Sequence, residues 1–106
     1  DYAEKACKKV QDGNAEIAIL VCGTGLGMSI AANKMKNIRA VVCGEEFSAY
    51  HAKSHNNANV LCLGARVVGI GLATLIVDTF LNASFEGGRH ERRVNKIAQL
   101  ESSLFE

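Results

Sequence analysis

The chain has 106 residues, which is enough for one domain spanning residues 1–106 and too few for two. Hydrophobic residues make up 48% of it, so a core can form, and 12 Lys and Arg against 11 Asp and Glu leave a net charge of +1. That charge is too small to favour nucleic acid as the main partner. No apolar run approaches the length of a membrane span, so we expect a cytoplasmic protein with no membrane partner.

In chain order, the hydrophobic pattern alternates between helical and extended segments. Residues 2–12 have the periodicity of a helix. Residues 16–21 form a short apolar run, whose branched side chains predict a strand buried on both faces. The glycine-rich turn at 22–27 follows, and a helix is predicted from there to about Met35.

The second half continues the same alternation. It predicts a strand at 38–43, a weaker helix at 45–53 and a strand at 59–63. Residues 70–81 predict a well-buried helix that carries Leu72, Leu75, Ile76, Phe80 and Leu81. A last helix is predicted from about Arg89, with Val94, Ile97 and Leu104 as its apolar stripe. Such an order is typical of a three-layer α/β domain with a Rossmann-like parallel sheet.

The four cysteines, Cys7, Cys22, Cys43 and Cys62, are widely spaced and form no CxxC pair. Neither a zinc ribbon nor a thioredoxin-like motif is therefore indicated. Cys43 and Cys62 lie inside apolar runs and are predicted to be small buried residues. Free thiols fit a reducing compartment better than a disulfide framework does.

Cys22 opens the sequence Cys-Gly-Thr-Gly-Leu-Gly at the carboxyl end of the first predicted strand. Ligands of open parallel sheets bind at this edge, and glycines there leave backbone N–H groups free to meet an anion at a helix start. The helix dipole would also stabilise a thiolate. Met28 excludes a dinucleotide fingerprint and a cysteine phosphatase loop, and no GK[ST] sequence follows. The competing interpretation is a tight turn whose cysteine only packs.

Cationic and imidazole side chains supply further candidates. Arg89 and Arg93 share one helix face and could hold a phosphate dianion, or they could belong to a solvated basic patch. His55 precedes a strand and suits acid–base chemistry near neutral pH, or it could cap a helix. His51 and His55 are spaced like two metal ligands, but no third ligand is evident, so no metal is expected. His90 is interpreted as a polar residue at a helix start.

Several longer motifs, in order, resemble the ribose-5-phosphate isomerase B family. They are Cys-Gly-Thr-Gly-Leu-Gly-Met-Ser-Ile-Ala-Ala-Asn-Lys at 22–34, Ser-His-Asn-Asn-Ala-Asn-Val-Leu at 54–61, Gly-Ala-Arg at 64–66, Val-Asp-Thr-Phe at 77–80 and Phe-Glu-Gly-Gly-Arg-His at 85–90, followed by Arg93. The similarity covers essentially the whole chain.

The resemblance implies an aldose–ketose isomerase that interconverts ribose 5-phosphate and ribulose 5-phosphate through an enediol, without a cofactor. It implies that Cys22 is the proton-abstracting base, that Thr24 positions or protonates sugar oxygens, and that His55 assists ring opening. The substrate-binding residues implied are Gly23, Gly25, Gly27 and Asn56 for the sugar and enediolate, and Arg66, Arg89 and Arg93 for the phosphate. It further implies a homodimer or tetramer whose active site lies at the subunit interface.

Two departures from the family pattern stand out. Family members begin with a strand that carries an Asp-His pair, then a helix and a second strand, whereas this sequence starts at the following helix. We therefore expect an N-terminally truncated domain that is weakly active or inactive alone. Phe47 stands near a position where the family often has tyrosine, so a hydroxyl contact would be lost.

Other functions remain compatible with the sequence. A galactose- or allose-6-phosphate isomerase would share the chemistry. A phosphocysteine carrier domain of a sugar phosphotransferase system would also place a cysteine before a small-residue loop, although it would not need His55, Arg89 or Arg93. An inactive fragment that only forms oligomers is the third alternative.

Overall fold

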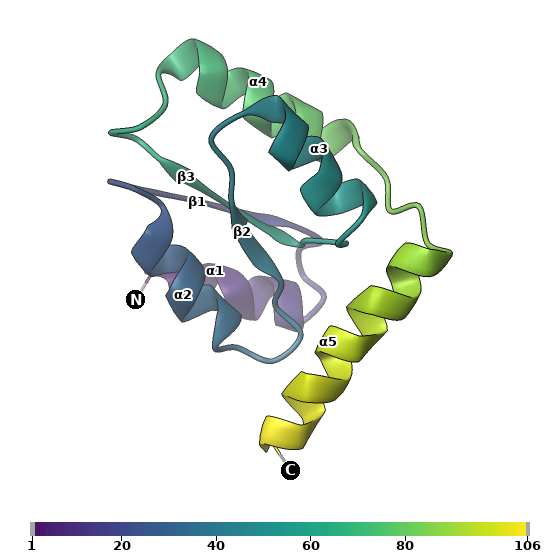
Figure 1. Cartoon of the computed structure of the whole chain (residues 1–106). Helices are drawn as coiled ribbons and strands as arrows, with labels where there is room; N and C mark the ends of the chain where they lie inside the picture. Colours follow the sequence, from purple (N-terminus) through teal and green to yellow (C-terminus); the bar gives the residue numbers. More distant parts are fainter. Residues whose placement is uncertain (1, 106) are drawn as a thin grey trace.

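The structure, a computed structural model, describes residues 2–105, with side chains described through residue 103. Helices and strands alternate along the chain as the sequence predicts (Figure 1). The elements are α1 (Tyr2–Gln11), β1 (Ala18–Cys22), α2 (Leu26–Asn33), β2 (Ala40–Val42), α3 (Glu46–Ser54), β3 (Val60–Gly64), α4 (Ile70–Asn82) and α5 (Arg89–Phe105).

The three strands form one parallel sheet in the order β1-β3-β2. In its register Ala18 pairs with Val60 and Cys22 pairs with Gly64, so β1 and β3 begin and end level with each other. All five residues of β3 are buried, because this strand is central and helices cover both of its faces. The predicted α/β class with a parallel, Rossmann-like sheet is confirmed.

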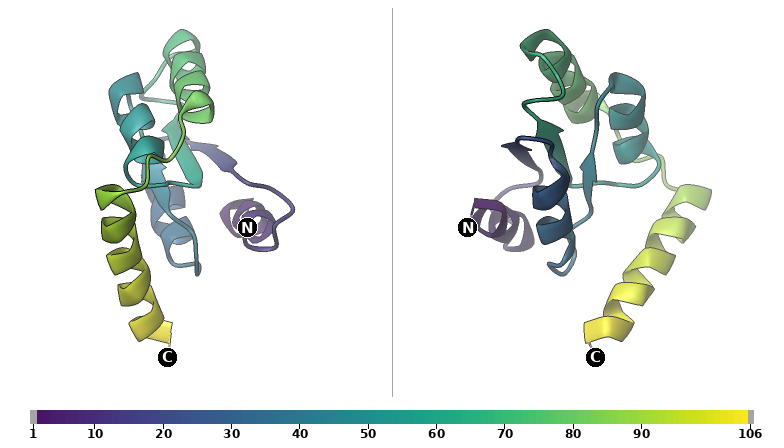
Figure 2. Two further views of the ribbon diagram at one scale, coloured as in Figure 1. Left: turned by 90° about the vertical axis from the view of Figure 1, so that its right-hand side faces the viewer. Right: turned by 60° about the vertical axis from the view of Figure 1, so that its left-hand side comes forward.

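Each face of the sheet has its own apolar cluster. On one face, α1 and α2 pack over β3 and β1 through residues that include Cys7, Leu20 and Ala32. On the other face, α3 and α4 pack through residues that include Leu61 and Phe80. The views in Figures 1 and 2 show the two helix pairs on opposite sides of the sheet. The expectation that Cys43 and Cys62 are buried is confirmed, and Cys7 is buried as well.

The expectation that the first strand is buried on both faces is wrong. Leu20 is buried, but Ile19 is 37% and Val21 is 55% exposed. The reason is position in the sheet: β1 is an edge strand, and the helices over the second face pack on β3 and on each other. Periodicity reports which side chains are apolar, but not whether another element reaches them.

The expectation of a well-buried helix at 70–81 is also wrong in part. Ile76 and Phe80 are buried, whereas Leu72, Leu75 and Leu81 are 37%, 44% and 47% exposed. The reason is that α4 packs against α3 and β3 along one side only, which leaves its other apolar side chains uncovered.

Helix α5 runs beside the body of the domain as a separate arm (Figures 1 and 2). On its predicted apolar stripe Val94 is buried and Ile97 is 53% exposed, while the side chain of Leu104 lies outside the described part. Glu101 ties the arm to the body by accepting a hydrogen bond from the Asn37 N–H at 2.6 Å. Within residues 2–105, no helix combines the length and the apolar character needed to cross a membrane.

Candidate active site

The loop after β1 places the Cys22 thiol at the carboxyl edge of the sheet. Cys22 is the last residue of β1, and the chain turns through Gly23, Thr24 and Gly25 into α2. The Gly25 N–H donates a hydrogen bond to the Cys22 sulfur at 3.1 Å. The sulfur therefore lies at the start of α2 and accepts a hydrogen bond from a backbone N–H.

Glycine is required at two positions for this loop to form. Gly25 has a φ of 83°, and a Cβ there would lie 3.2 Å from the Leu63 carbonyl carbon and from a Val42 methyl. At Gly64 a Cβ would lie 2.7 Å from the backbone of Thr24. The loop therefore rests directly on the end of β3, and this contact fixes the sulfur relative to the sheet.

Cys22 differs from the other thiols in exposure and environment. It is half-buried, whereas Cys7, Cys43 and Cys62 are buried. Burial raises the pKa of Cys43 to about 11, with a further rise from the nearby Glu45 carboxylate. Burial, followed by the neighbouring thiols, raises the pKa of Cys62 to about 12, and burial also raises the pKa of Cys7. These three thiols stay protonated near neutral pH, which leaves Cys22 as the candidate nucleophile or base.

Two predicted site residues, Arg66 for substrate binding and Thr24 for catalysis, lie beside Cys22. The Arg66 N–H donates to the Gly23 carbonyl at 2.9 Å, and the Arg66 side chain comes within 3.7 Å of a Cβ built on Gly23. Thr24 accepts a hydrogen bond from the Leu26 N–H through its hydroxyl at 3.3 Å. A cavity of about 660 Å³ opens next to the thiol; it is lined by Tyr2, Ala3, Glu4, Cys22, Gly27, Met28, Ala31 and Met35. A small ligand has room to reach the sulfur.

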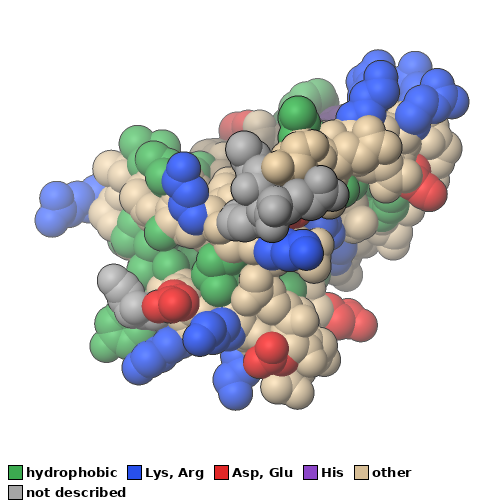
Figure 3. Space-filling model, turned by 90° about the horizontal axis from the view of Figure 1, so that it is seen from below, with side chains coloured by type: hydrophobic (Ala, Val, Ile, Leu, Met, Phe, Trp, Pro, Cys, Tyr) green, Lys and Arg blue, Asp and Glu red, His purple; other side chains and the backbone are tan. Residues whose placement is uncertain are grey.

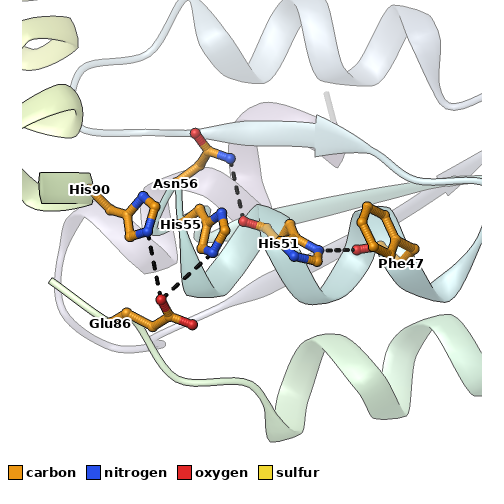
Figure 4. A network of polar contacts seen from close by, with 6 residues as sticks. All are labelled: Phe47, His51, His55, Asn56, Glu86 and His90. Carbon is orange, nitrogen blue, oxygen red and sulfur yellow. Dashed lines mark hydrogen bonds and ion pairs between the residues drawn. The ribbon is translucent and has the colours of Figure 1, made fainter.

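A second group of predicted residues gathers around the end of α3 (Figure 4). His55 caps α3, and Asn56 donates to the His51 carbonyl at 3.3 Å. The Nε2 atom of His55 lies 3.6 Å from a carboxylate oxygen of Glu86, and the same oxygen lies 3.6 Å from Nε2 of His90. His55 is thus held in a side-chain cluster rather than standing alone as a helix cap.

Arg89 and Arg93 occupy the first turns of α5 and are exposed. Among the described residues, neither guanidinium is paired with a carboxylate. In the view of Figure 3, Lys and Arg side chains gather at one corner of the molecule. The left-handed residues Gly87 and Gly88, with φ of 74° and 57°, turn the chain into α5 and set this basic face beside His55. Two unpaired guanidiniums on one helix face remain available for an anion.

The predicted site residues therefore form two separate groups in one chain. Cys22 lies at the carboxyl end of β1, level with the last residue of β3, whereas His55 precedes the first residue of β3. A five-residue strand spans about 13 Å between its first and last residues. Figure 1 accordingly shows the loop after β1 and the start of α5 at opposite ends of the sheet. Arg66 lies beside Cys22 and far from Arg89 and Arg93. The three arginines of one chain therefore cannot bind the same phosphate.

A metal ion does not fit the histidine cluster well. His55, Glu86 and His90 offer ligand atoms within 4.8 Å of one another. However, the two imidazole rings stack with centroids 3.9 Å apart and an interplanar angle of 10°. Imidazole binds a metal through a lone pair in the ring plane, at about 2 Å. One ion cannot lie in two parallel planes that are separated by this stack.

The sequence interpretation missed the roles of Glu86 and His90. His90, expected to be only a polar residue at a helix start, is 8% exposed and stacks on His55. Glu86 was not a candidate. Its spacing of four residues from His90 was the available signal, but the two glycines between them concealed it.

The chain also matches known proteins over nearly its whole length. The family model described as Ribose/Galactose Isomerase matches residues 1–97. Ribose-5-phosphate isomerase B of Escherichia coli is 52% identical over 100 residues, which cover 94% of this chain and 67% of that protein. D-erythrulose-4-phosphate isomerase of Pectobacterium atrosepticum is 46% identical over 101 residues, covering 95% of this chain and 66% of that one.

Solved structures give the same result in three dimensions. Ribose-5-phosphate isomerase B of Clostridium thermocellum has a TM-score of 0.94 at 50% identity, over 98% of this chain and 72% of the other. The Mycoplasma genitalium ribose-5-phosphate isomerase B, solved with bound ribulose-5-phosphate, has a TM-score of 0.88 at 45% identity, over 96% and 70%. The chain spans about two thirds of the length of these relatives.

Proposed function

The chain belongs to the ribose/galactose isomerase family, and from this premise we propose that it interconverts ribose 5-phosphate and ribulose 5-phosphate through an enediol. The observation that carries the proposal is the half-buried Cys22 thiol at the carboxyl edge of the sheet, whose sulfur accepts a hydrogen bond from the Gly25 N–H. The same edge is where ligands of parallel α/β sheets bind.

In the proposed reaction Cys22 is the base. Its thiolate removes the proton from C2 of the open-chain aldose, and the electron pair moves to the carbonyl oxygen at C1. Loop amides and the start of α2 would stabilise the resulting enediolate, because dipoles fixed by the fold need no reorganisation as negative charge develops. The oxygen at C1 takes up a proton and the hydroxyl at C2 loses one. Returning the proton from the thiol to C1 while the oxygen at C2 becomes the carbonyl then completes the isomerisation without any redox partner.

Arg89 and Arg93 are proposed to bind the phosphate, together with Arg66. Phosphate binding at the unreactive end of the sugar orients the reacting carbons, so the binding energy lowers the entropic cost of the proton transfer. Thr24 and Asn56 would hold sugar hydroxyl groups, and His55 would assist ring opening as an acid–base group.

We propose that a second copy of the chain completes the site. Cys22 and Arg66 lie at one end of the sheet, and His55, Arg89 and Arg93 lie near the other. In a dimer, the Cys22 end of one copy could pack against the His55 end of its partner. Both groups of residues would then line one site. Apolar side chains left exposed on β1 and α4, such as Val21, Leu72 and Leu75, support a surface that another chain covers.

The substrate could also be a different sugar phosphate of the same reaction class. The family description includes galactose isomerases, and one relative is named for a four-carbon ketose phosphate. A panel of aldose phosphates with four, five and six carbons would decide this. We expect the highest kcat/KM with ribose 5-phosphate. The assay is run with the family's N-terminal strand–helix–strand supplied as a second polypeptide. No turnover of any of these substrates under that condition, with the thiol free and the protein folded, would refute the proposed activity.

A further inference from the structure

Glu86 lies beside two stacked histidines from different elements and faces both with one carboxylate oxygen (Figure 4). One of its carboxylate oxygens is 3.6 Å from Nε2 of His55, at the end of α3, and 3.6 Å from Nε2 of His90, in the first turn of α5. The two imidazole rings stack almost in parallel, with centroids 3.9 Å apart. A carboxylate at this distance from both rings attracts an N–H from each, so it biases which nitrogen of His55 carries its proton.

The cluster is held from several directions. The Glu86 N–H donates to the Ser54 carbonyl at 2.9 Å, which fastens the loop to the end of α3. His90 is buried and its ring covers one face of His55. The ring of His51 meets the ring of His55 edge-on, with centroids 4.6 Å apart. These contacts on several sides constrain the orientation of the His55 ring.

The surroundings of His90 disfavour its charged form. Burial lowers the pKa of His90, and the neighbouring His55, Arg89 and Arg93 lower it further, while Glu86 opposes them. His90 is therefore mostly neutral at pH 7 and acts as a flat apolar support. From α3 the cluster also faces His51, whereas Lys53 lies over the Phe80 ring on another side.

We propose that Glu86 is a positioning residue for His55. Its carboxylate holds the Nε2 side of the imidazole and the ring of His90 supports it from behind. Nδ1, the other ring nitrogen, then accepts the proton of the anomeric hydroxyl of a cyclic aldose phosphate and passes it to the ring oxygen as the C1–O ring bond breaks. The substrate part of this inference rests on the proposed function. The arrangement of Glu86, His90 and His55 rests on the geometry alone.

The kinetic test separates ring opening from isomerisation. Ribose 5-phosphate must open its ring before the C2 proton can be removed, whereas erythrose 4-phosphate has no free hydroxyl that could close a furanose ring. Glu86→Gln keeps the size of the side chain but removes its charge. We expect it to lower kcat/KM for ribose 5-phosphate on the order of tenfold, and to leave kcat/KM for erythrose 4-phosphate unchanged.

Matched variants give the controls. Glu91→Gln removes an exposed carboxylate one residue beyond His90, and it should leave kcat/KM unchanged for both substrates. His90→Phe keeps the flat support but removes the titrating ring, and it should retain more activity on ribose 5-phosphate than His90→Ala. An equal loss on both substrates for Glu86→Gln would mean a general structural effect and would overturn the proposal.

A second measurement does not depend on activity. Nitrogen-15 NMR of the imidazoles reports which nitrogen carries the proton, and we expect His55 to have its proton on Nε2 in the wild type. Glu86→Gln should shift His55 toward a mixture of the two tautomers. Identical tautomer populations in both proteins would overturn the positioning role. If the tautomer changed but the ratio of kcat/KM for ribose 5-phosphate to kcat/KM for erythrose 4-phosphate did not, the assignment of ring opening to His55 would be refuted.

Discussion

The two ends of the sheet differ in the groups that line them. At the Cys22 end the site is mostly backbone: one thiol, an N–H donor from Gly25, and glycines that allow a close approach. At the His55 end it consists of side chains from three segments, namely the end of α3, the loop at Glu86 and the start of α5. Backbone dipoles suit a charge that develops in one place, whereas side chains suit proton exchange and phosphate binding.

The largest expected effect would come from removing the thiol. Cys22→Ala should lower kcat by on the order of 10²–10⁴, since a general base contributes that much. Binding of the sugar phosphate should persist, because we propose other residues, Arg89 and Arg93, for the phosphate. Exchange of the substrate C2 proton with solvent, followed by NMR in deuterated water, measures the step directly. Full exchange in the variant would show that another group is the base.

The separation of the two ends can be tested by mixing inactive variants. Cys22→Ala damages one end and Arg93→Ala damages the other. If each site combines opposite ends of two copies, refolding the two variants together at equal amounts should restore about one quarter of wild-type activity, because half of the dimers are mixed and each of those has one intact site.

The control for that experiment pairs two variants from the same end. Mixing Cys22→Ala with Arg66→Ala should restore nothing, because Arg66 lies beside the Cys22 loop and every site would still carry one damaged residue. Recovery in the control, or none in the test mixture, would contradict a site shared in this way.

The tight contact beneath the Cys22 loop predicts a smaller, structural effect. Gly64→Ala places a methyl group 2.7 Å from the Thr24 backbone. We expect it to lower the free energy of unfolding by about 1–3 kcal/mol. Gly71→Ala in α4 meets no atom within 4 Å and should instead stabilise the domain by about 0.5–1 kcal/mol. Denaturant unfolding of both variants measures the difference, and equal values would refute the close contact.

The smallest expected effects concern the reactivity of the four thiols and the dependence of stability on pH. Near pH 8 a disulfide reagent should titrate Cys22 alone in the folded protein and all four cysteines after unfolding. Because burial raises the pKa of Cys62 from 9.0 to about 12, the unfolded chain loses that proton first as the pH rises. The free energy of unfolding should therefore fall as the pH increases from about 9 toward 12. Rapid labelling of a second thiol in the folded state would contradict this burial.

Local features were predictable because they depend on neighbouring residues. The order of helices and strands follows from hydrophobic periodicity, and the turn after β1 follows from the spacing of Cys22, Gly23 and Gly25. The burial of Cys43 and Cys62 also followed from the apolar runs that contain them. Burial of β1 and α4 was overestimated, because an apolar residue is covered only if another element reaches it.

By itself, the sequence determined the α/β class, the position of Cys22 at a strand end and the basic face of Arg89 and Arg93. Only the tertiary structure decided that Cys22 and His55 lie at opposite ends of the sheet, and that Glu86 and His90 enclose His55. The physical reason is that these relations depend on strand register and on how a loop folds back against a helix. Both are set by packing between distant segments, which no local pattern of residues records.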